Sequence, residues 1–349
     1  MKVRLQMFVI CILILTTQSS CKKSDSQTSD NSNGNNADLI SRFMPVDSTY
    51  ALFTSICIDK NNNKWLTTNE GVYKFDGTTW THYNSSNTAI AFGNTMSIQS
   101  DASGIVYAIT QPNVNNKPLL AIFKSGVWSS YPFPFNALKI YINKSSTNLF
   151  VLAEGGTLYA YNGSGDYSNY SSYNKIVGVS GNSNDCYFYN GVWYFSFDYS
   201  NATDNNKYSG FASTDKNLPQ PVYYTPNPNY ISMSKVITSD GTSIILVGTS
   251  GNSMSALQKL YLYKNGVWSV IPYNTADQKL EVVSSIVYSK DGSLWIGSYL
   301  DGFAKYYNGN FTFYSYGNNI PVVSGLAIDD SNIKWIATYT SGLLKCTAQ

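Results

Sequence analysis

The chain has 349 residues, with 23 Lys and Arg against 21 Asp and Glu, and only 13% of its residues are charged. A chain with so little excess positive charge has no basic face for nucleic acid, because binding to the phosphate backbone is mainly electrostatic. Tyr (29), Phe (16) and Trp (7) are frequent, and 25 Gly can supply turns. This composition favours β structure with a large apolar core.

Residues 1–20 are predicted to be an export signal. They comprise a basic start, the apolar run MFVICILIL and the small-residue stretch TTQSS, as in a secretion signal. Nine apolar residues are too few to span a bilayer. Cys21 follows directly and resembles the lipidated cysteine of bacterial lipoproteins, although Gln18 stands where the usual motif has Leu. An ordinary secretion signal is the alternative.

Residues 21–38 are predicted to be a lipid-anchored, flexible tether, because they are polar and nearly free of apolar side chains. A coil of this length reaches roughly 20–25 Å. Removal of residues 1–20 takes away Lys2 and Arg4, which leaves 21 basic and 21 acidic side chains. We therefore expect a formally neutral protein held to a membrane through the lipid on Cys21. Its expected location is the cell envelope, at the outer membrane, facing the periplasm or the surface.

From residue 39 onward, a loose motif recurs about every 40–50 residues. A large apolar residue opens a phrase such as WIGS at Trp65, Tyr107, Phe150, Leu246, Trp295 and Trp335, and Trp193 follows Phe150 by 43 residues. Each unit is expected to hold four β segments, which is typical of a β-propeller. The sequence therefore predicts an all-β, seven-bladed β-propeller over residues 39–349.

Hairpins give the clearest signal within the units, because Gly-containing turns separate alternating apolar residues. The stretches are YKFDGTTWTHY, IFKSGVWSSY, YAYNGSGDYSNY, LYKNGVWSVI and KYYNGNFTFY. The last unit reaches Gln349 after its third strand, so ISRFMPVD at residues 40–47 is predicted to supply the fourth strand and close the ring. Residues 171–230 allow two interpretations. Around Trp193, NGVWYFSF is either a second strand or a third-to-fourth hairpin.

The phrase DGSLWIGSYLDGFAKY, with the spacings Asp59–Trp65 and Asp329–Trp335, resembles the two-component regulator propeller repeat. The copy that starts at Asp291 is two residues shorter between Asp and Trp. Good matches cover the first, sixth and seventh units. The resemblance implies either the periplasmic sensor domain of a hybrid histidine kinase or a stand-alone secreted or lipidated protein, and this chain is similar to the stand-alone form.

The repeated residues are interpreted first as structural. Trp65, Trp295 and Trp335 are expected to wedge between neighbouring units, whereas Trp80, Trp128 and Trp268 are expected to brace outer strands. Asp residues in the turns between first and second strands are expected to accept hydrogen bonds from backbone N–H groups. These residues are Asp59, Asp101, Asp240, Asp291 and Asp329.

The sequence predicts no catalytic residue. His82 is the only histidine, which excludes a Ser-His-Asp triad and a multi-histidine metal site within one chain. It also speaks against lyases of the streptogramin-inactivating type, which depend on a pair of histidines. A carboxylate pair among Glu70, Glu154 and Asp301 stays open as acid and base.

No metal site or cofactor is predicted either. Cys57, Cys186 and Cys346 form an odd set without CxxC spacing, so we expect small buried apolar residues rather than disulfides or zinc ligands. The stretch from Asp59 has carboxylate or amide side chains at four positions of a calcium loop, but Lys64 stands where that loop needs Gly.

A ligand is expected at the end of the propeller that carries the loops between second and third strands and between units. These loops are rich in Tyr, Phe and Asn, which suit sugars or peptides that stack and hydrogen-bond. Simple packing of the loops is the alternative for each aromatic residue. The candidate ligand-binding residues are Tyr50, Glu70, Phe92, Phe135, Tyr230, Tyr273, Tyr299, Asp301, Tyr316 and Tyr339.

Three functional hypotheses follow. The first is an envelope lipoprotein that binds or senses a ligand, with glycans as the ligand class. The second is a protein–protein scaffold in the envelope, which requires an exposed apolar patch. The third is a lyase or hydrolase, which requires carboxylates that converge with raised pKa values.

Overall fold

The chain divides into two units, Met1–Asn35 and Asn36–Gln349. The computed structural model describes part of the second unit. The described ranges are 39–45, 52–112, 117–143, 148–154, 156–172, 182–189, 192–200, 207–213, 222–224, 236–239, 243–249, 258–265, 267–271, 280–314, 321–339 and 341–349.

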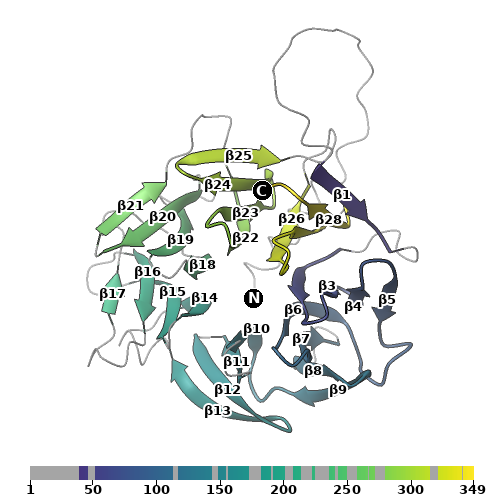
Figure 1. Ribbon diagram of the computed structural model, residues 1–349. Helices are drawn as coiled ribbons and strands as arrows, with labels where there is room; N and C mark the ends of the chain where they lie inside the picture. The colour runs from purple at the N-terminus through teal and green to yellow at the C-terminus, as the bar shows by residue number, and fades with distance from the viewer. Residues whose placement is uncertain are drawn as a thin grey trace, which may run out of the picture. The chain divides into compact units, whose positions relative to one another are not determined.

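The described residues form antiparallel β-sheets of four strands each and contain no α-helix (Figure 1). We number these sheets I–VII in chain order. Sheet I holds β2 (Ser55–Ile58), β3 (Lys64–Thr68), β4 (Gly71–Phe75) and β5 (Trp80–Tyr83). Sheet II holds β6 (Asn94–Ser100), β7 (Val106–Gln111), β8 (Leu119–Lys124) and β9 (Val127–Pro132). Sheet III holds β10 (Ala137–Asn143), β11 (Asn148–Ala153), β12 (Thr157–Gly163) and β13 (Asp166–Ser172).

The remaining sheets repeat this order of strands. Sheet IV holds β14 (Asn182–Tyr189), β15 (Val192–Ser200), β16 (Lys207–Ser213) and β17 (Val222–Tyr224). Sheet V holds β18 (Val236–Ser239), β19 (Ser243–Thr249), β20 (Gln258–Lys264) and β21 (Val267–Ile271). Sheet VI holds β22 (Val283–Tyr288), β23 (Leu294–Ser298), β24 (Gly302–Tyr307) and β25 (Asn310–Tyr314). Sheet VII holds β26 (Val323–Ile328), β27 (Lys334–Thr338), β28 (Leu343–Cys346) and β1 (Ile40–Phe43).

The strand predicted near residues 40–47 is β1, and it pairs antiparallel with β28. Ile40 lies opposite Cys346 and Phe43 lies opposite Leu343. First strands of successive sheets contact one another, and β26 also contacts β2 of sheet I. A series of four-stranded sheets joined through their first strands is the arrangement of a β-propeller.

Serine side chains link neighbouring first strands. The Ser97 hydroxyl in β6 accepts a hydrogen bond from the Ile140 N–H in β10 at 3.1 Å, and Ser285 in β22 does the same for the Leu326 N–H at 3.1 Å. Both serines follow a register shift in their strand. Ile140 and Leu326 lie in edge strands of their own sheets, where outward N–H groups have no partner within the sheet, so a hydroxyl of the neighbouring sheet can accept from them.

The predicted wedging of tryptophans between sheets is confirmed in the described residues. The Trp65 ring of sheet I is buried and lies 4.9 Å from the Phe123 ring of sheet II. Trp335 of sheet VII packs 6.3 Å from Phe75 of sheet I. Aromatic rings at such distances join apolar burial to favourable tilted contacts, so these residues hold sheet to sheet.

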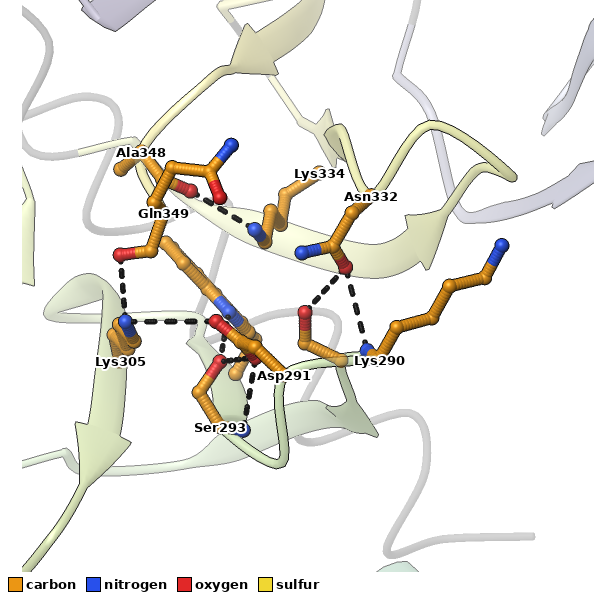
Figure 2. Close-up of polar contacts among 10 residues, drawn as sticks. Lys290, Asp291, Ser293, Lys305, Asn332, Lys334, Ala348 and Gln349 are labelled. Carbon is orange, nitrogen blue, oxygen red and sulfur yellow. Dashed lines mark hydrogen bonds and ion pairs between the residues drawn. The ribbon is translucent and has the colours of Figure 1, made fainter.

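A lysine directly precedes Trp65 and another directly precedes Trp335. Each lysine side chain contacts a tryptophan of the sheet before its own in the ring order. The Lys64 ammonium lies 4.1 Å from the centre of the Trp335 ring, and that of Lys334 lies 4.9 Å from the Trp295 ring. Lys334 also donates to the Ala348 carbonyl at 2.8 Å (Figure 2). Burial lowers the pKa of both lysines, against the opposing effect of nearby carboxylates. Cation–π contact compensates part of this desolvation.

The predicted repeat alignment is wrong by one position in two sheets, IV and V. β15 is a second strand, as one interpretation held. After the bulge in β14, Asp185 pairs with Ser196 as Ser97 pairs with Ile109 in sheet II. Tyr194, and not Trp193, therefore occupies the position of Tyr107. A shift of one residue moves a side chain to the opposite face, and the Trp193 ring indeed packs 4.8 Å from Phe150 of the preceding sheet.

The same correction applies to sheet V. Ile244 lies opposite Tyr263 as Val106 lies opposite Phe123. Ile245, and not Leu246, therefore takes the aligned position, and Ile245 packs with the apolar residues of sheet VI.

The turn before Trp295 has the full length, contrary to the shorter spacing predicted from Asp291. Ser289 takes the position of Asp59, because its N–H donates to the Ser293 carbonyl and its carbonyl accepts from Gly292. Asp291 instead accepts from the Ser293 hydroxyl at 2.6 Å and N–H at 3.0 Å (Figure 2). Burial alone would raise the pKa of Asp291, but these hydrogen bonds outweigh it and lower the pKa to about 2.

The other described turns match the prediction. Asp59, Asp101 and Asp329 each accept two backbone N–H groups within their turn. Asp240 lies outside the described residues. Cys57, Cys186 and Cys346 are buried, as expected, and are not joined in disulfides.

Candidate ligand-binding site

Two predicted tyrosines, Tyr299 of sheet VI and Tyr339 of sheet VII, are in direct contact. Their ring centres lie 5.8 Å apart, and the ring planes meet at 62°. Each tyrosine directly follows the second strand of its sheet and is half-buried. The Tyr299 N–H donates to the Val282 carbonyl at 3.1 Å, and the Tyr339 N–H donates to Val322 at 2.9 Å. The backbone of both residues is therefore fixed beside the first strand of its own sheet.

Asp301 lies in the same turn as Tyr299, between β23 and β24. Its Oδ2 atom accepts a short hydrogen bond from the Glu281 N–H and lies 3.1 Å from the Ser298 hydroxyl. That hydroxyl also makes a short contact with the Glu281 carbonyl. It accepts the N–H groups of Leu300 and Asp301, each at 3.1 Å. Ser298 and Asp301 thus hold the turn and the residues before β22 together.

The segment held in this way is conformationally unusual. Val282 has φ of 53°, a left-handed backbone that is rare for a β-branched residue. A backbone held in this region costs of order 1–3 kcal/mol, and such residues concentrate at functional sites. Leu300 at the tip of the turn is 53% exposed. Two tyrosine rings, one exposed leucine and one carboxylate therefore occur together in what we call the Tyr299–Tyr339 site.

This combination suits recognition of a ligand. An aromatic face packs against the C–H face of a sugar ring or an aliphatic chain, and a carboxylate accepts hydrogen bonds from hydroxyl or N–H donors. Within the described ranges, no set of three or more His, Cys, Asp and Glu side chains is placed to hold a metal ion. The same part of the chain holds no helix long and apolar enough to cross a membrane.

A second aromatic group occurs at the corresponding end of sheet III. The predicted Phe135 stacks on Tyr159 with ring centres 3.9 Å apart and contacts Tyr167 edge-on at 5.3 Å. Beside it, the Asn136 amide donates to Glu154 Oε2 at 2.9 Å. Because Phe135 has rings against it in two directions, much of its surface is used in packing.

The other predicted residues are placed differently. Phe92 is buried and packs edge-on against Trp128 at 5.2 Å. Glu70 is exposed in the turn between β3 and β4, where its N–H donates to Thr68 Oγ1 at 3.1 Å. Glu70, Glu154 and Asp301 have separate contacts within their own sheets. The described contacts therefore do not form a carboxylate pair from them. Cys21, Tyr50, Tyr230, Tyr273 and Tyr316 lie outside the described residues.

Sequence reasoning missed Glu281, Ser298 and Leu300. Ser298 and Asp301 in the turn contact the backbone of Glu281, which lies about twenty residues earlier in the chain. The string SYLDG contains no signal for that partner.

A buried polar group between sheets III and IV was also missed. Asp185 Oδ1 accepts from the Lys139 ammonium at 2.7 Å and from the Tyr141 hydroxyl at 2.6 Å. Burial, followed by the charge of Asp185, raises the pKa of Tyr141 well above its usual value. The Cys186 N–H donates to the Tyr141 oxygen at 3.0 Å, so this group links the two sheets where a serine does so elsewhere.

Solved structures with this fold come from several kinds of protein. The extracellular domain of the hybrid two-component system BT3049 from Bacteroides thetaiotaomicron aligns with a TM-score of 0.63 at 19% identity, over 88% of this chain and 41% of that chain. Virginiamycin B lyase from Staphylococcus aureus aligns with a TM-score of 0.62 at 13% identity, over 89% and 99% of the two chains. YCF48 from Cyanidioschyzon merolae aligns with a TM-score of 0.62 at 12% identity, over 88% and 99%.

These similarities establish a β-propeller fold with repeat character and not a shared activity. The chain spans about two fifths of the length of the extracellular domains of BT3049 and BT4673 that it matches, 41% and 40%. Several of these structures are extracellular domains. No protein-family model and no curated protein matches the chain.

Proposed function

We propose that the chain is a ligand-binding and sensing module of the cell envelope, with glycans as its ligand class. The observation that carries this proposal is the contact between Tyr299 and Tyr339, with the Asp301 carboxylate in the same turn. Rings on two neighbouring sheets, each with a fixed backbone, form a preorganised platform, which lowers the entropy lost on binding.

The platform follows from a seven-bladed ring in which β1 closes the last blade. This part of the proposal is supported by the pairing of β1 with β28 and by the contact between β26 and β2. An Ile40→Cys variant tests the closure, because directly opposed strand residues lie about 4.5–5.5 Å apart at Cα, within disulfide range. Oxidation should join position 40 to Cys346 and raise the melting temperature. An Ile40→Cys/Cys346→Ser variant should show no rise, and failure to form the bond would refute the closure.

Attachment through a lipid on Cys21 places this module at a membrane surface. The fold similarity to extracellular sensor domains supports an envelope location. Metabolic labelling with a palmitate analogue should mark the full chain and leave a Cys21→Ala variant unlabelled. Equal labelling of both would argue against the anchor.

We propose a binding role without catalysis. Virginiamycin B lyase shares the fold, and a form of it in which histidine is replaced by alanine is described as catalytically inactive. In this chain the single histidine, His82, stacks on Tyr73 with ring centres 4.0 Å apart, in β5. The Tyr299–Tyr339 site contains no histidine.

The second candidate function is a scaffold that binds another envelope protein. Leu300, 53% exposed beside two tyrosines, favours it, because exposed apolar groups with aromatic neighbours are typical of interfaces. YCF48 bound to the D1 peptide is a structure of this fold in a complex. A peptide partner and a glycan would therefore compete for the same site.

The proposal is tested with the purified full chain by calorimetric titration against a panel of oligosaccharides and envelope peptides. Tyr339→Ala should weaken binding at least tenfold, because truncation of an aromatic anchor removes most of its contact energy. Tyr159→Ala, on sheet III, is the matched control and should leave the affinity within about twofold. Equal binding by wild type and Tyr339→Ala would place the ligand elsewhere.

A further inference from the structure

The chemistry around the tyrosine pair narrows the class of ligand. We infer that the Tyr299–Tyr339 site takes neutral sugar units and excludes sugars that carry a carboxylate or a sulfate. This inference rests on the proposed function, and it concerns the selectivity of the same site.

The Asp301 carboxylate is the feature that selects. Its Oδ2 atom is engaged by Ser298 and by the Glu281 N–H, which fixes the orientation of the group. No residue in the described ranges donates to the second oxygen, Oδ1. An acceptor of this kind beside an aromatic ring is suited to a pair of sugar hydroxyls, because hydrogen bonds to an ionised acceptor are stronger than neutral ones.

The same carboxylate disfavours an anionic ligand. A uronate or sulfate group on a sugar stacked at Tyr299 would come close to Asp301, which is two residues further along the same turn. Like charges placed opposite each other are unfavourable and suppress binding of the wrong ligand.

Arg42 is a positive charge with a described contact to the turn that follows Tyr339. Its Nε atom donates to the Ser341 carbonyl at 2.7 Å. Arg42 belongs to β1, the outermost strand of sheet VII, whereas Tyr339 follows the second strand. The guanidinium thus fixes the turn after Tyr339 in sheet VII, whereas Asp301 lies in the turn of sheet VI.

The test compares neutral hexose oligomers with uronate oligomers of matched length and linkage, by calorimetric titration of the full chain at low ionic strength. Wild type should bind the neutral oligomer at least tenfold more tightly than the uronate. Asp301→Asn keeps an acceptor for the Glu281 N–H and removes the charge, so the ratio should fall to about threefold or less. Glu70→Gln removes a carboxylate from the corresponding turn of sheet I and should leave the ratio unchanged.

Each other outcome has a distinct meaning. Uronate binding equal to or tighter than neutral binding would overturn the selectivity and leave the proposed function standing. If an Arg42→Gln variant then lost the uronate, Arg42 would be identified as the selecting residue in place of Asp301. A ratio that stays constant in Asp301→Asn would also overturn the inference. Absence of binding by every oligosaccharide would overturn both the inference and the glycan-binding function.

Discussion

Replacement of Asp329 by alanine should destabilise the propeller far more than its place in a turn suggests. Asp329 is 4% exposed. Its Oδ1 atom accepts the N–H groups of Ser331 and Ile333, each at 3.0 Å, and its Oδ2 atom accepts the Trp335 indole N–H at 2.9 Å. Each unsatisfied buried donor costs about 1–3 kcal/mol. With three donors left unpaired and partial relaxation of the turn, we expect a loss of about 3–5 kcal/mol in the free energy of unfolding.

The assay is urea unfolding of the full chain, followed by circular dichroism. Asp330→Ala is the matched control, because Asp330 is fully exposed and its ion pair with Lys290 spans 3.5 Å. It should change stability by no more than about 0.5 kcal/mol. Asp329→Asn should cost less than Asp329→Ala, since an amide oxygen still serves the two backbone groups. A loss in Asp329→Ala as small as that in Asp330→Ala would refute the reasoning.

Three further predictions concern single residues. The pKa of Asp291 is lowered to about 2, so its carboxylate stabilises the fold above pH 4, and this stabilisation is lost between pH 4 and 2. In acid titration, the Asp291→Asn variant should therefore lose less of its free energy of unfolding than wild type, by about 1 kcal/mol after solvent screening. Burial raises the pKa of Tyr314 to about 12, so stability should fall by about 1.4 kcal/mol per pH unit between pH 10 and 12 from this group, and Tyr314→Phe should remove that contribution in alkaline melts. Val282→Gly should be less destabilising than Val322→Gly by about 1–3 kcal/mol in urea unfolding, because glycine relieves the left-handed backbone at position 282 alone; equal losses would show that Val282 is unstrained.

Much of the fold could be predicted because its determinants are local. A Gly-containing turn between alternating apolar residues specifies a hairpin. The strings NGVW, just before Val270, and DGTTW, just before His82, each contain this signal within a few residues. The positions of Trp65, Trp295 and Trp335 followed from the same repeats. β1 was predicted from the count of strands, since the repeat that contains Trp335 lacks one.

The register of sheets IV and V could not be read in the same way. In VWYFSF and SIILVG several neighbouring residues are aromatic or apolar, so the sequence does not mark which of them takes the repeated position. The pairing of strands decides it, and it makes Tyr194 the equivalent of Tyr107. The serine at position 289 was missed for a related reason. It makes the backbone contacts that Asp59 makes in sheet I, but the nearby Asp291 offered a more conspicuous match.

The candidate site was predicted residue by residue and not as a group. Tyr299, Asp301 and Tyr339 were each selected for their place in loops, yet their association depends on the distance between sheets VI and VII. The Glu281–Asp301 hydrogen bond and the left-handed Val282 require three-dimensional contacts. Sequence periodicity predicts which loop each residue occupies, whereas the packing of neighbouring sheets determines which of these residues are in contact.

The antiparallel pairing of β1 with β28 also determines how the protein responds to mechanical load. Ile40 lies opposite Cys346, and the Thr347 N–H donates to the Leu39 carbonyl at 2.9 Å, so the chain enters β1 at the same end of the sheet at which it leaves β28. A force that separates residues 39 and 347 would open these hydrogen bonds one after another, as in unzipping, and not all at once, as in shear. The four-residue strand β1 would therefore detach at low force and before the remaining sheets.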